Sequence, residues 1–160
     1  MNKILFSITL FGLVLSSPVY SENKAPELGL SSIGSGTIQL SNYKGKVIYL
    51  DFWATWCVPC RKSFPWMNEM LRKYQAKGLE IIAVSLDEKT KMVETFLKRY
   101  PADFTIALDQ EGRTADLYQV RVMPSSYIID REGKIIESHM GFRNKDKAKL
   151  ESLIQKTLSL

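Results

Sequence analysis

The sequence predicts a single domain of the α/β class, in which helices flank a central mixed β-sheet. Residues 47–52 and 79–85 form nearly continuous apolar runs, which is typical of strands that are buried on both faces. Apolar residues recur at helical spacing after each of these runs. Strands that alternate with helices in this way indicate a sheet covered by helices. The chain has 160 residues, which is enough for one well-formed core.

The expected elements follow one another along the chain. Residues 22–35 are polar and rich in Gly and Ser, so we expect a loosely ordered lead-in. Residues 37–40 alternate as in a short edge strand. A helix starts at Arg61 and ends at Gly78. The remaining elements are a helix stopped by Pro101, a strand over 104–108, a short helix over 114–118, a hairpin of 127–130 and 135–140, and a last helix capped by Asn144.

The N-terminus has the layout of a secretory signal peptide. Lys3 precedes an apolar run over 4–15, and small residues flank Tyr20 at the expected cleavage position. The run is shorter than the ~18–20 residues that a membrane span needs, although an uncleaved anchor is the alternative. We therefore expect a signal peptide over 1–21, cleavage after Ser21, a mature domain over 22–160 without stable membrane insertion, and a periplasmic location.

The charge pattern excludes one class of partner. The chain has 22 Lys and Arg against 17 Asp and Glu, a formal net charge of +5. These charges are interleaved along the sequence, and no basic block threaded with aromatic residues is present. We therefore expect a solvated basic surface and no binding of nucleic acid.

The only two cysteines, Cys57 and Cys60, lie two residues apart between the strand over 47–52 and the helix that follows. A thiol at a helix start is favoured as the thiolate, because free backbone N–H groups and the helix dipole stabilise negative charge. We expect Cys57 to be the nucleophile, with a pKa below the ~8.5 of a free thiol. Its thiolate attacks a substrate disulfide, and Cys60 then resolves the mixed disulfide.

Two other interpretations of the cysteine pair, a permanent structural disulfide and a zinc site, have less support. A permanent disulfide in so small a ring stabilises the fold by roughly 2 kcal/mol, against about 3 kcal/mol for a 15-residue loop. A structural zinc site needs four ligands, and the two cysteines with His139, the single histidine, supply three at most. We expect redox chemistry, no metal and no cofactor.

The chain resembles the thioredoxin superfamily, in particular its extracytoplasmic TlpA/ResA-like thiol–disulfide reductase branch. The resemblance spans roughly residues 26–158. It rests on Phe-Trp-Ala-Thr-Trp-Cys-Val-Pro-Cys-Arg over 52–61, on Val-Met-Pro over 122–124, and on a strand-and-helix insertion over 88–108. It implies a thioredoxin-like fold with that insertion before a cis-proline loop. The chain departs from common family residues at Met123 (often Thr), at Ser63 (often Glu) and at Asp51 (often Asn).

The resemblance also implies roles for individual residues. Asp51, a carboxyl within an apolar strand, is either a surface residue or a buried acid with a raised pKa, and its family position favours a general base for Cys60. A cis-Pro124 would turn the backbone of Met123 toward the sulfurs, where it can pair with an extended substrate. With Met123 and Pro124, we expect Trp56, on an exposed rim, and Val58 and Pro59, which also help to set the reduction potential, to bind substrate. The apolar stripes of their elements place Met92 and Met140 in the core, and His139, with nothing to pair with in sequence, is expected on the surface.

The sequence thus predicts a protein-disulfide reductase that acts, as a monomer, on disulfide-bearing exported proteins. The resemblance implies a membrane thiol reductase as electron donor, with clients such as the haem-binding cysteines of apocytochrome c or cell-envelope proteins. A disulfide oxidase, which differs only in potential, remains an alternative. A non-catalytic thioredoxin-like binding module is disfavoured by the intact thiol pair. A peroxidase is weaker still, because no cysteine lies in a Thr-x-x-Cys setting.

Overall fold

The computed structural model describes residues 23–34 and 36–160. The expected signal peptide over 1–21 and its cleavage after Ser21 lie outside the described residues. Within the described part of the chain, no helix is both long enough and apolar enough to cross a membrane.

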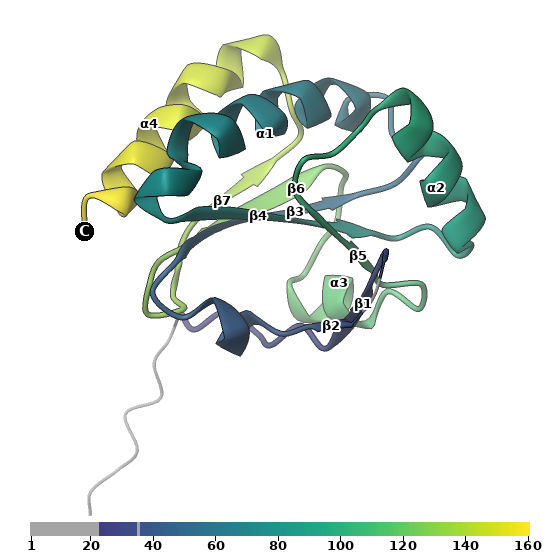
Figure 1. Ribbon diagram of the computed structural model, residues 1–160, viewed down its shortest axis with the longest axis horizontal. Helices are drawn as coiled ribbons and strands as arrows, with labels where there is room; N and C mark the ends of the chain where they lie inside the picture. The colour runs from purple at the N-terminus through teal and green to yellow at the C-terminus, as the bar shows by residue number, and fades with distance from the viewer. Residues whose placement is uncertain (1–22, 35) are drawn as a thin grey trace, which may run out of the picture.

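A seven-stranded mixed sheet forms the centre of the molecule, in the order β2-β1-β5-β4-β3-β6-β7 (Figure 1). The middle strands β3, β4 and β5 are parallel, whereas β6, β7, β1 and β2 join the sheet by antiparallel pairing. The strands are β1 (Leu30–Ser32), β2 (Thr37–Ile38), β3 (Val47–Trp53), β4 (Leu79–Ser85), β5 (Thr105–Leu108), β6 (Ser125–Ile129) and β7 (Ile135–Met140).

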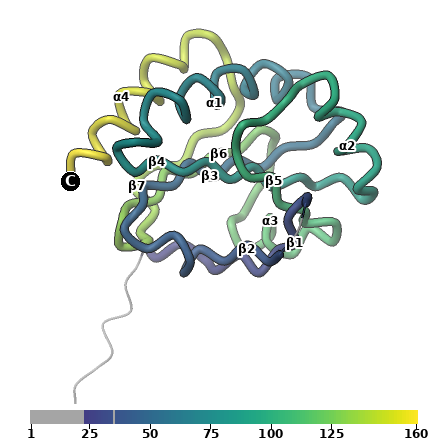
Figure 2. Tube along the Cα trace, viewed as in Figure 1, coloured from purple at the N-terminus to yellow at the C-terminus, as the bar shows by residue number. Residues whose placement is uncertain are grey.

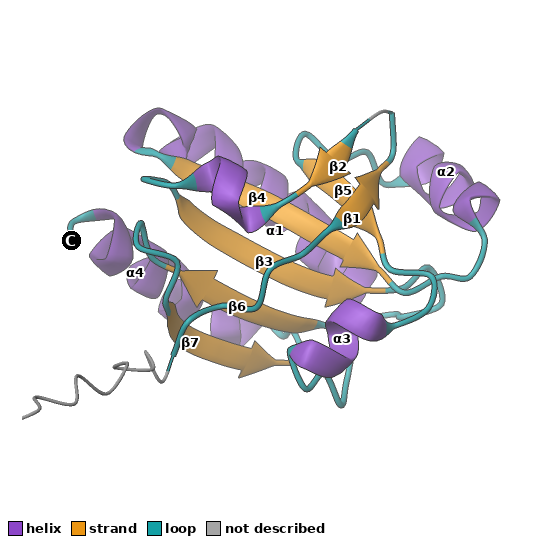
Figure 3. Ribbon diagram, turned by 90° about the horizontal axis from the view of Figure 1, so that it is seen from below, coloured by secondary structure: helices purple, strands orange, loops and turns teal. Residues whose placement is uncertain are grey.

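Helices cover both faces of this sheet, so the predicted α/β class with flanking helices is confirmed. Helices α1 (Cys60–Tyr74), α2 (Thr90–Arg99) and α4 (Lys147–Leu158) lie on one side, and α3 (Arg113–Leu117) lies on the other (Figures 1 and 3). Short 3-10 turns complete the chain: η1 (Leu40–Tyr43), η2 (Gln75–Lys77) and η3 (Asn144–Asp146). The insertion predicted over 88–108 corresponds to α2 and β5, which come between β4 and the proline loop before β6.

Strand β3 is an inner strand of the sheet, and all seven of its residues are buried. It lies between β4 and β6, so neither of its edges is open. Successive side chains of a strand point to opposite faces of the sheet. Tyr49 and Trp53 therefore join the core under α1, while Leu50 and Phe52 join the core on the α3 side. This two-sided burial explains why the sequence of β3 reads as a continuous apolar run.

The N-terminal segment is more ordered than the sequence predicts. Residues 23–34 run along the α3 side of the sheet (Figure 2), where β1 pairs with both β2 and β5. Leu28 and Leu30 are buried there, and the backbone N–H of Ala25 donates to the Gly133 carbonyl at 2.9 Å. The expectation of a loosely ordered lead-in over 22–35 was wrong for these residues. Leu28 and Leu30 anchor the segment, but the Gly and Ser residues around them obscure the apolar pattern in the sequence.

Two methionines expected in the core are exposed. Met92 on α2 is 43% exposed, and Met140 at the end of β7 is 67% exposed. Both residues lie in apolar stripes, but β7 is an edge strand and α2 lies at the margin of the sheet (Figure 1). The periodicity of the sequence identifies the apolar face of an element, but it does not show which residues of that face lie beyond the core.

The start of the last helix also differs from its prediction. Asn144 is not the cap of α4, because a 3-10 turn, η3, comes first and α4 begins at Lys147. At the start of η3, the carboxylate of Asp146 accepts a hydrogen bond from the backbone N–H of Arg143 at 2.9 Å, whereas no side chain of the described residues caps α4. The same carboxylate lies 3.5 Å from Nε2 of His139. His139, expected as a plain surface residue, is therefore largely buried beside an acid, and its side chain is 16% exposed.

Candidate active site

The two cysteines lie where β3 ends and α1 begins. They form a disulfide in the structure, with their Cα atoms 5.3 Å apart. The backbone N–H of Cys57 donates to the Ala54 carbonyl at 3.0 Å, which closes the turn after β3. The backbone N–H of Cys60, the first residue of α1, donates to Sγ of Cys57 at 3.3 Å. The helix start thus directs a hydrogen-bond donor at the sulfur of Cys57, which is the contact that stabilises a thiolate.

Exposure differs around the pair. Cys60 is fully buried and Cys57 is 4% exposed, so Cys57 is the sulfur nearer to solvent. Its two neighbours, Trp56 and Val58, are 63% and 60% exposed. Pro59 is half-buried in a right-handed helical conformation at the entry to α1. The two residues that flank Cys57 in the sequence therefore present apolar side chains to solvent.

The loop that contains Pro124 lies at the same end of the sheet. The peptide bond between Met123 and Pro124 is cis, as the resemblance implied. Ser125, the next residue, pairs with Phe52 near the end of β3. Met123 is half-buried and packs against the core that contains both cysteines. The structure thus brings together, at one end of the sheet, the cysteines, Trp56, Val58, Pro59, Met123 and Pro124.

Asp51 is a buried acid on β3. It is 1% exposed, and its Oδ2 has no hydrogen-bond partner among the described residues. Burial raises the pKa of this carboxyl well above its usual range, because a low-dielectric interior disfavours the charged form. The alternation of β3 places Asp51 on the same face as Tyr49 and Trp53, toward the core that contains Cys60. Burial, followed by the charge of Asp51, also raises the pKa of Tyr49.

A second buried acid, Asp87, was not expected from the sequence. It follows β4 and is 3% exposed. It accepts hydrogen bonds from the backbone N–H of Thr55 at 2.9 Å, from the Thr55 hydroxyl at 2.7 Å and from the Ser85 hydroxyl at 2.9 Å. Thr55 lies two residues before Cys57, so Asp87 anchors the loop that leads to it. The sequence did hold a clue to this contact. Parallel strands end at the same edge of a sheet, and the polar residues Thr55 and Asp87 follow β3 and β4.

The aromatic core beneath the site includes a tryptophan that the sequence alone could not place. Trp66 on α1 packs edge-on against Tyr49, with ring centroids 5.5 Å apart, and at a tilt against Phe142, with ring centroids 5.4 Å apart. Trp53 packs in turn against Phe64 at 4.6 Å. The helix that begins with Cys60 is therefore held against the sheet by aromatic side chains.

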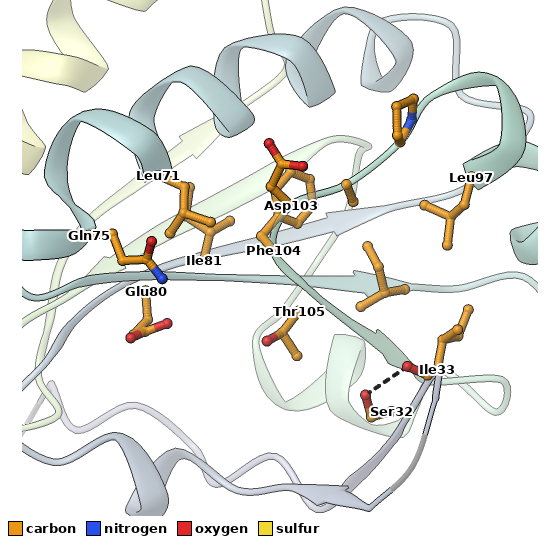
Figure 4. Close-up of a pocket in the computed structure, with 13 residues that line it drawn as sticks. Ser32, Ile33, Leu71, Gln75, Glu80, Ile81, Leu97, Asp103, Phe104 and Thr105 are labelled. Atoms are coloured by element: carbon orange, nitrogen blue, oxygen red, sulfur yellow. Dashed lines mark hydrogen bonds between the residues drawn. The ribbon is translucent and has the colours of Figure 1, made fainter.

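Other features of the described residues offer no comparable chemistry. No group of three or more His, Cys, Asp or Glu side chains in 23–34 and 36–160 is placed to hold a metal ion. A cavity of about 610 Å³ lies between the end of α1 and strands β4 and β5, lined by residues that include Leu71, Glu80 and Phe104 (Figure 4). Glu80 is near the start of β4, whereas the disulfide follows the end of the parallel strand β3. Neither cysteine lines this cavity.

Comparison with known proteins agrees with this geometry. The model of the AhpC/TSA family matches residues 22–138. The thiol-disulfide oxidoreductase ResA of Bacillus cereus is 35% identical over 97% of this chain and 96% of its own length. The chain belongs to the thioredoxin-like AhpC/TSA family. A solved structure from Chlorobium tepidum assigned as the thiol:disulfide interchange protein DsbE is 51% identical, with a TM-score of 0.83 over 85% of this chain and 96% of its own.

These similarities confirm the thioredoxin-like fold and the recognised family. The ResA protein of Bacillus subtilis, 37% identical, covers 71% of this chain and 63% of its own length. Relatives of this kind, together with the Cys57–Cys60 disulfide, show that the chain is a thiol–disulfide oxidoreductase. The enzyme class predicted from the sequence is therefore confirmed, whereas the roles of the individual site residues, including which cysteine is the nucleophile, stay predictions.

Proposed function

We propose that this family member is a reductase that acts outside the cytoplasm, donating electrons from Cys57 and Cys60 to disulfides of exported proteins. The surroundings of the two cysteines support this direction of electron transfer. The residues between the cysteines are Val58 and Pro59, so no cation lies within the motif. Among the described residues, Sγ of Cys57 accepts a single hydrogen bond, and it comes from the backbone N–H of Cys60. A dithiol–disulfide pair is a strong oxidant when its reduced form is specially stabilised. With one backbone hydrogen bond and no cation inside the motif, the Cys57 thiolate gains little stabilisation, which favours a pair that donates electrons.

The reaction follows from the positions of the sulfurs. The thiolate of Cys57 attacks one sulfur of a client disulfide, so a mixed disulfide forms and the first client thiolate leaves. Cys60 loses its proton and its thiolate attacks Sγ of Cys57, which releases the second client thiolate. The client disulfide gains two electrons, and the Cys57–Cys60 pair loses two as its own disulfide forms.

Asp51 is the proposed general base for the second step. The proton of Cys60 must leave a fully buried position, and Asp51 is the buried acid that faces this core from β3. Because burial raises the pKa of Asp51, this carboxyl is a better match for a thiol than an exposed aspartate is. In this proposal the proton passes from Cys60 to Asp51 through water.

The proposed client site is the exposed rim around Cys57. Trp56 and Val58 offer apolar contacts, and the backbone of Met123, turned by Pro124, offers an edge that can pair with an extended client segment. We also propose that a membrane thiol reductase restores the dithiol, because an oxidising exterior does not. Cleavage after Ser21, a periplasmic location, a mature domain over 22–160 and a monomeric state belong to the same proposal.

Trapping of the mixed disulfide tests this function. In a Cys60→Ser variant the second step is blocked, so Cys57 should stay bonded to a peptide that enters with a disulfide. The Cys57→Ser variant is the matched control and should trap nothing. Capture by Cys57→Ser in place of Cys60→Ser would contradict the assignment of the nucleophile. Reduced wild-type protein that leaves peptide disulfides intact, while its oxidised form converts peptide dithiols to disulfides, would favour the oxidase alternative.

A further inference from the structure

A groove of about 460 Å³ lies beside the redox site, between α2 and the start of α1. Thr55 lines it, and the next two residues in the chain are the exposed Trp56 and the nucleophile Cys57. Figure 1 shows α2 at the end of the molecule where β3 finishes and α1 begins. The groove is therefore continuous with the surface on which a client disulfide must arrive.

Helix α2 lines this groove with two parallel rows of side chains. Residues four apart lie one above the other on the same helix face. Lys91, Thr95 and Arg99 form a polar row at this spacing. Met92 and Phe96 on α2, with Tyr100 directly after the helix, form an apolar row beside it. A ligand in the groove would thus contact cations along one side and apolar groups along the other.

The charge of the groove is positive. Its lining includes Arg61, Lys91 and Arg99, and it includes no acidic residue. In the described part of the chain, no carboxylate lies within 4.0 Å of the guanidinium of Arg61 or Arg99. Lys91 has one acidic neighbour, Glu94, at 3.8 Å on the exposed surface of α2. The two arginines are therefore free to meet an anionic partner.

Arg61 is held at the rim nearest the disulfide. Its Nη2 donates a hydrogen bond to the Thr55 carbonyl at 3.3 Å, which places its positive charge beside the loop before Cys57. An acidic group bound there would adjoin the site of exchange. Guanidinium groups are well suited to this contact because they pair with carboxylates through two parallel hydrogen bonds.

We propose that this groove binds an acidic, extended segment of the disulfide-bearing protein that the enzyme reduces. The inference rests on the proposed function, since it names the chemistry of the client. Lys91 and Arg99 are eight residues apart on α2, so the rows are about 12 Å long. An extended chain covers that length with about four residues. Alternate side chains of such a chain point in opposite directions, so acidic and apolar residues in alternation match the two rows.

The test compares two synthetic peptides of equal length, each carrying one disulfide. In one, Asp alternates with Phe beside the cysteine, and in the other Lys alternates with Phe. We expect the wild-type enzyme to reduce the acidic peptide with a kcat/KM about tenfold higher, in keeping with two or three exposed charge contacts. The double variant Lys91→Glu/Arg99→Glu should reverse this ratio. The control Lys145→Glu/Lys156→Glu, with the same change of charge on η3 and α4, should keep the wild-type ratio.

Because both peptides are measured on the same variant, any change in folding or potential cancels in the ratio. Equal kcat/KM for the two peptides would overturn the groove proposal and leave the reductase function standing. If neither peptide is reduced, the reductase function fails, and the groove is then tested separately. A cysteine-free acidic peptide should bind wild-type protein more tightly than the Lys91→Glu/Arg99→Glu variant in titration calorimetry, and equal affinity would overturn the proposal.

Anionic lipid is the other surface that cations could meet. Vesicles of phosphatidylglycerol should not compete with the acidic peptide at equal charge concentration, because a flat bilayer cannot enter a groove that is about four residues long. Sedimentation with these vesicles that is lost in Lys91→Glu/Arg99→Glu, together with no preference between the peptides, would assign the cations to a membrane and overturn the proposal.

Discussion

Asp87 and Thr55 are joined by two hydrogen bonds, one from the Thr55 backbone N–H and one from its hydroxyl, at 2.9 and 2.7 Å. The pair connects the end of β4 to the loop that leads from β3 to the nucleophile. Arg61 donates to the carbonyl of the same threonine at 3.3 Å. The loop before Cys57 is therefore held from both the sheet and the helix.

This anchor predicts a graded effect on stability. Asp87→Ala removes the acceptor for three donors, so the free energy of unfolding of the oxidised protein should fall by about 2–3 kcal/mol. Thr55→Val removes one of the three hydrogen bonds, and the loss should be about 1 kcal/mol. Urea denaturation measures both changes. A loss for Thr55→Val that equals or exceeds that for Asp87→Ala would contradict the role of Asp87 as the common acceptor.

Asp51 predicts a dependence of stability on pH. The unfolded carboxyl loses its proton near pH ~4. The folded one keeps its proton to a higher pH, because burial raises its pKa. The folded state therefore binds more protons in this window, and the free energy of unfolding falls as pH rises through it. Asp51→Asn lacks this titration and should be more stable than wild type at pH 7, by about 1–3 kcal/mol.

At pH 3 the gain from Asp51→Asn should disappear, because the carboxyl is then protonated in both states. The exposed Asp116→Asn is the matched control and should follow wild type at both pH values. In the same Asp51→Asn protein, disulfide exchange near neutral pH should be slower, since the general base is gone. A gain that is equal at pH 3 and pH 7 would contradict the buried-acid account, and an unchanged exchange rate would contradict the general base.

Replacement of Trp56 should change activity toward a client without changing the stability of the fold. Its side chain is 63% exposed, so Trp56→Ala should change the free energy of unfolding by no more than about 0.5 kcal/mol. The kcat/KM for a protein client should fall about tenfold, because exposed aromatic residues often dominate binding. Ile136→Ala, on β7 and 42% exposed, is a control of similar character and should leave kcat/KM as it was. Equal losses for the two variants would show that Trp56 is not part of the client surface.

The sequence predicted the central strands and the redox pair because their signals are local. The run that became β3 is buried on both faces, and the cysteines follow it directly. Long-range partners were harder to foresee. Asp87 is 32 residues from Thr55, and no periodic pattern connects them. His139 likewise finds its neighbour Asp146 only when η3 folds back beside β7.

The other predictions that failed concern residues at the edges of the fold. β1 has three residues, too few for a visible alternation, and it forms only because β2 and β5 lie on either side. Met92 and Met140 match the periodicity of their elements, yet nothing covers them fully where those elements reach the edge of the described molecule. Periodicity identifies the apolar face of a helix or strand, whereas the burial of that face depends on which other elements pack against it.

The reduction potential of the Cys57–Cys60 pair tests the central claim most directly. It is measured by equilibrating the protein with dithiothreitol or glutathione buffers and quantifying the free thiols. A reductase should have a potential near or below that of thioredoxin, about -270 mV. A value approaching about -120 mV would mean that the pair readily gives up its disulfide, and would contradict the proposed direction of electron transfer.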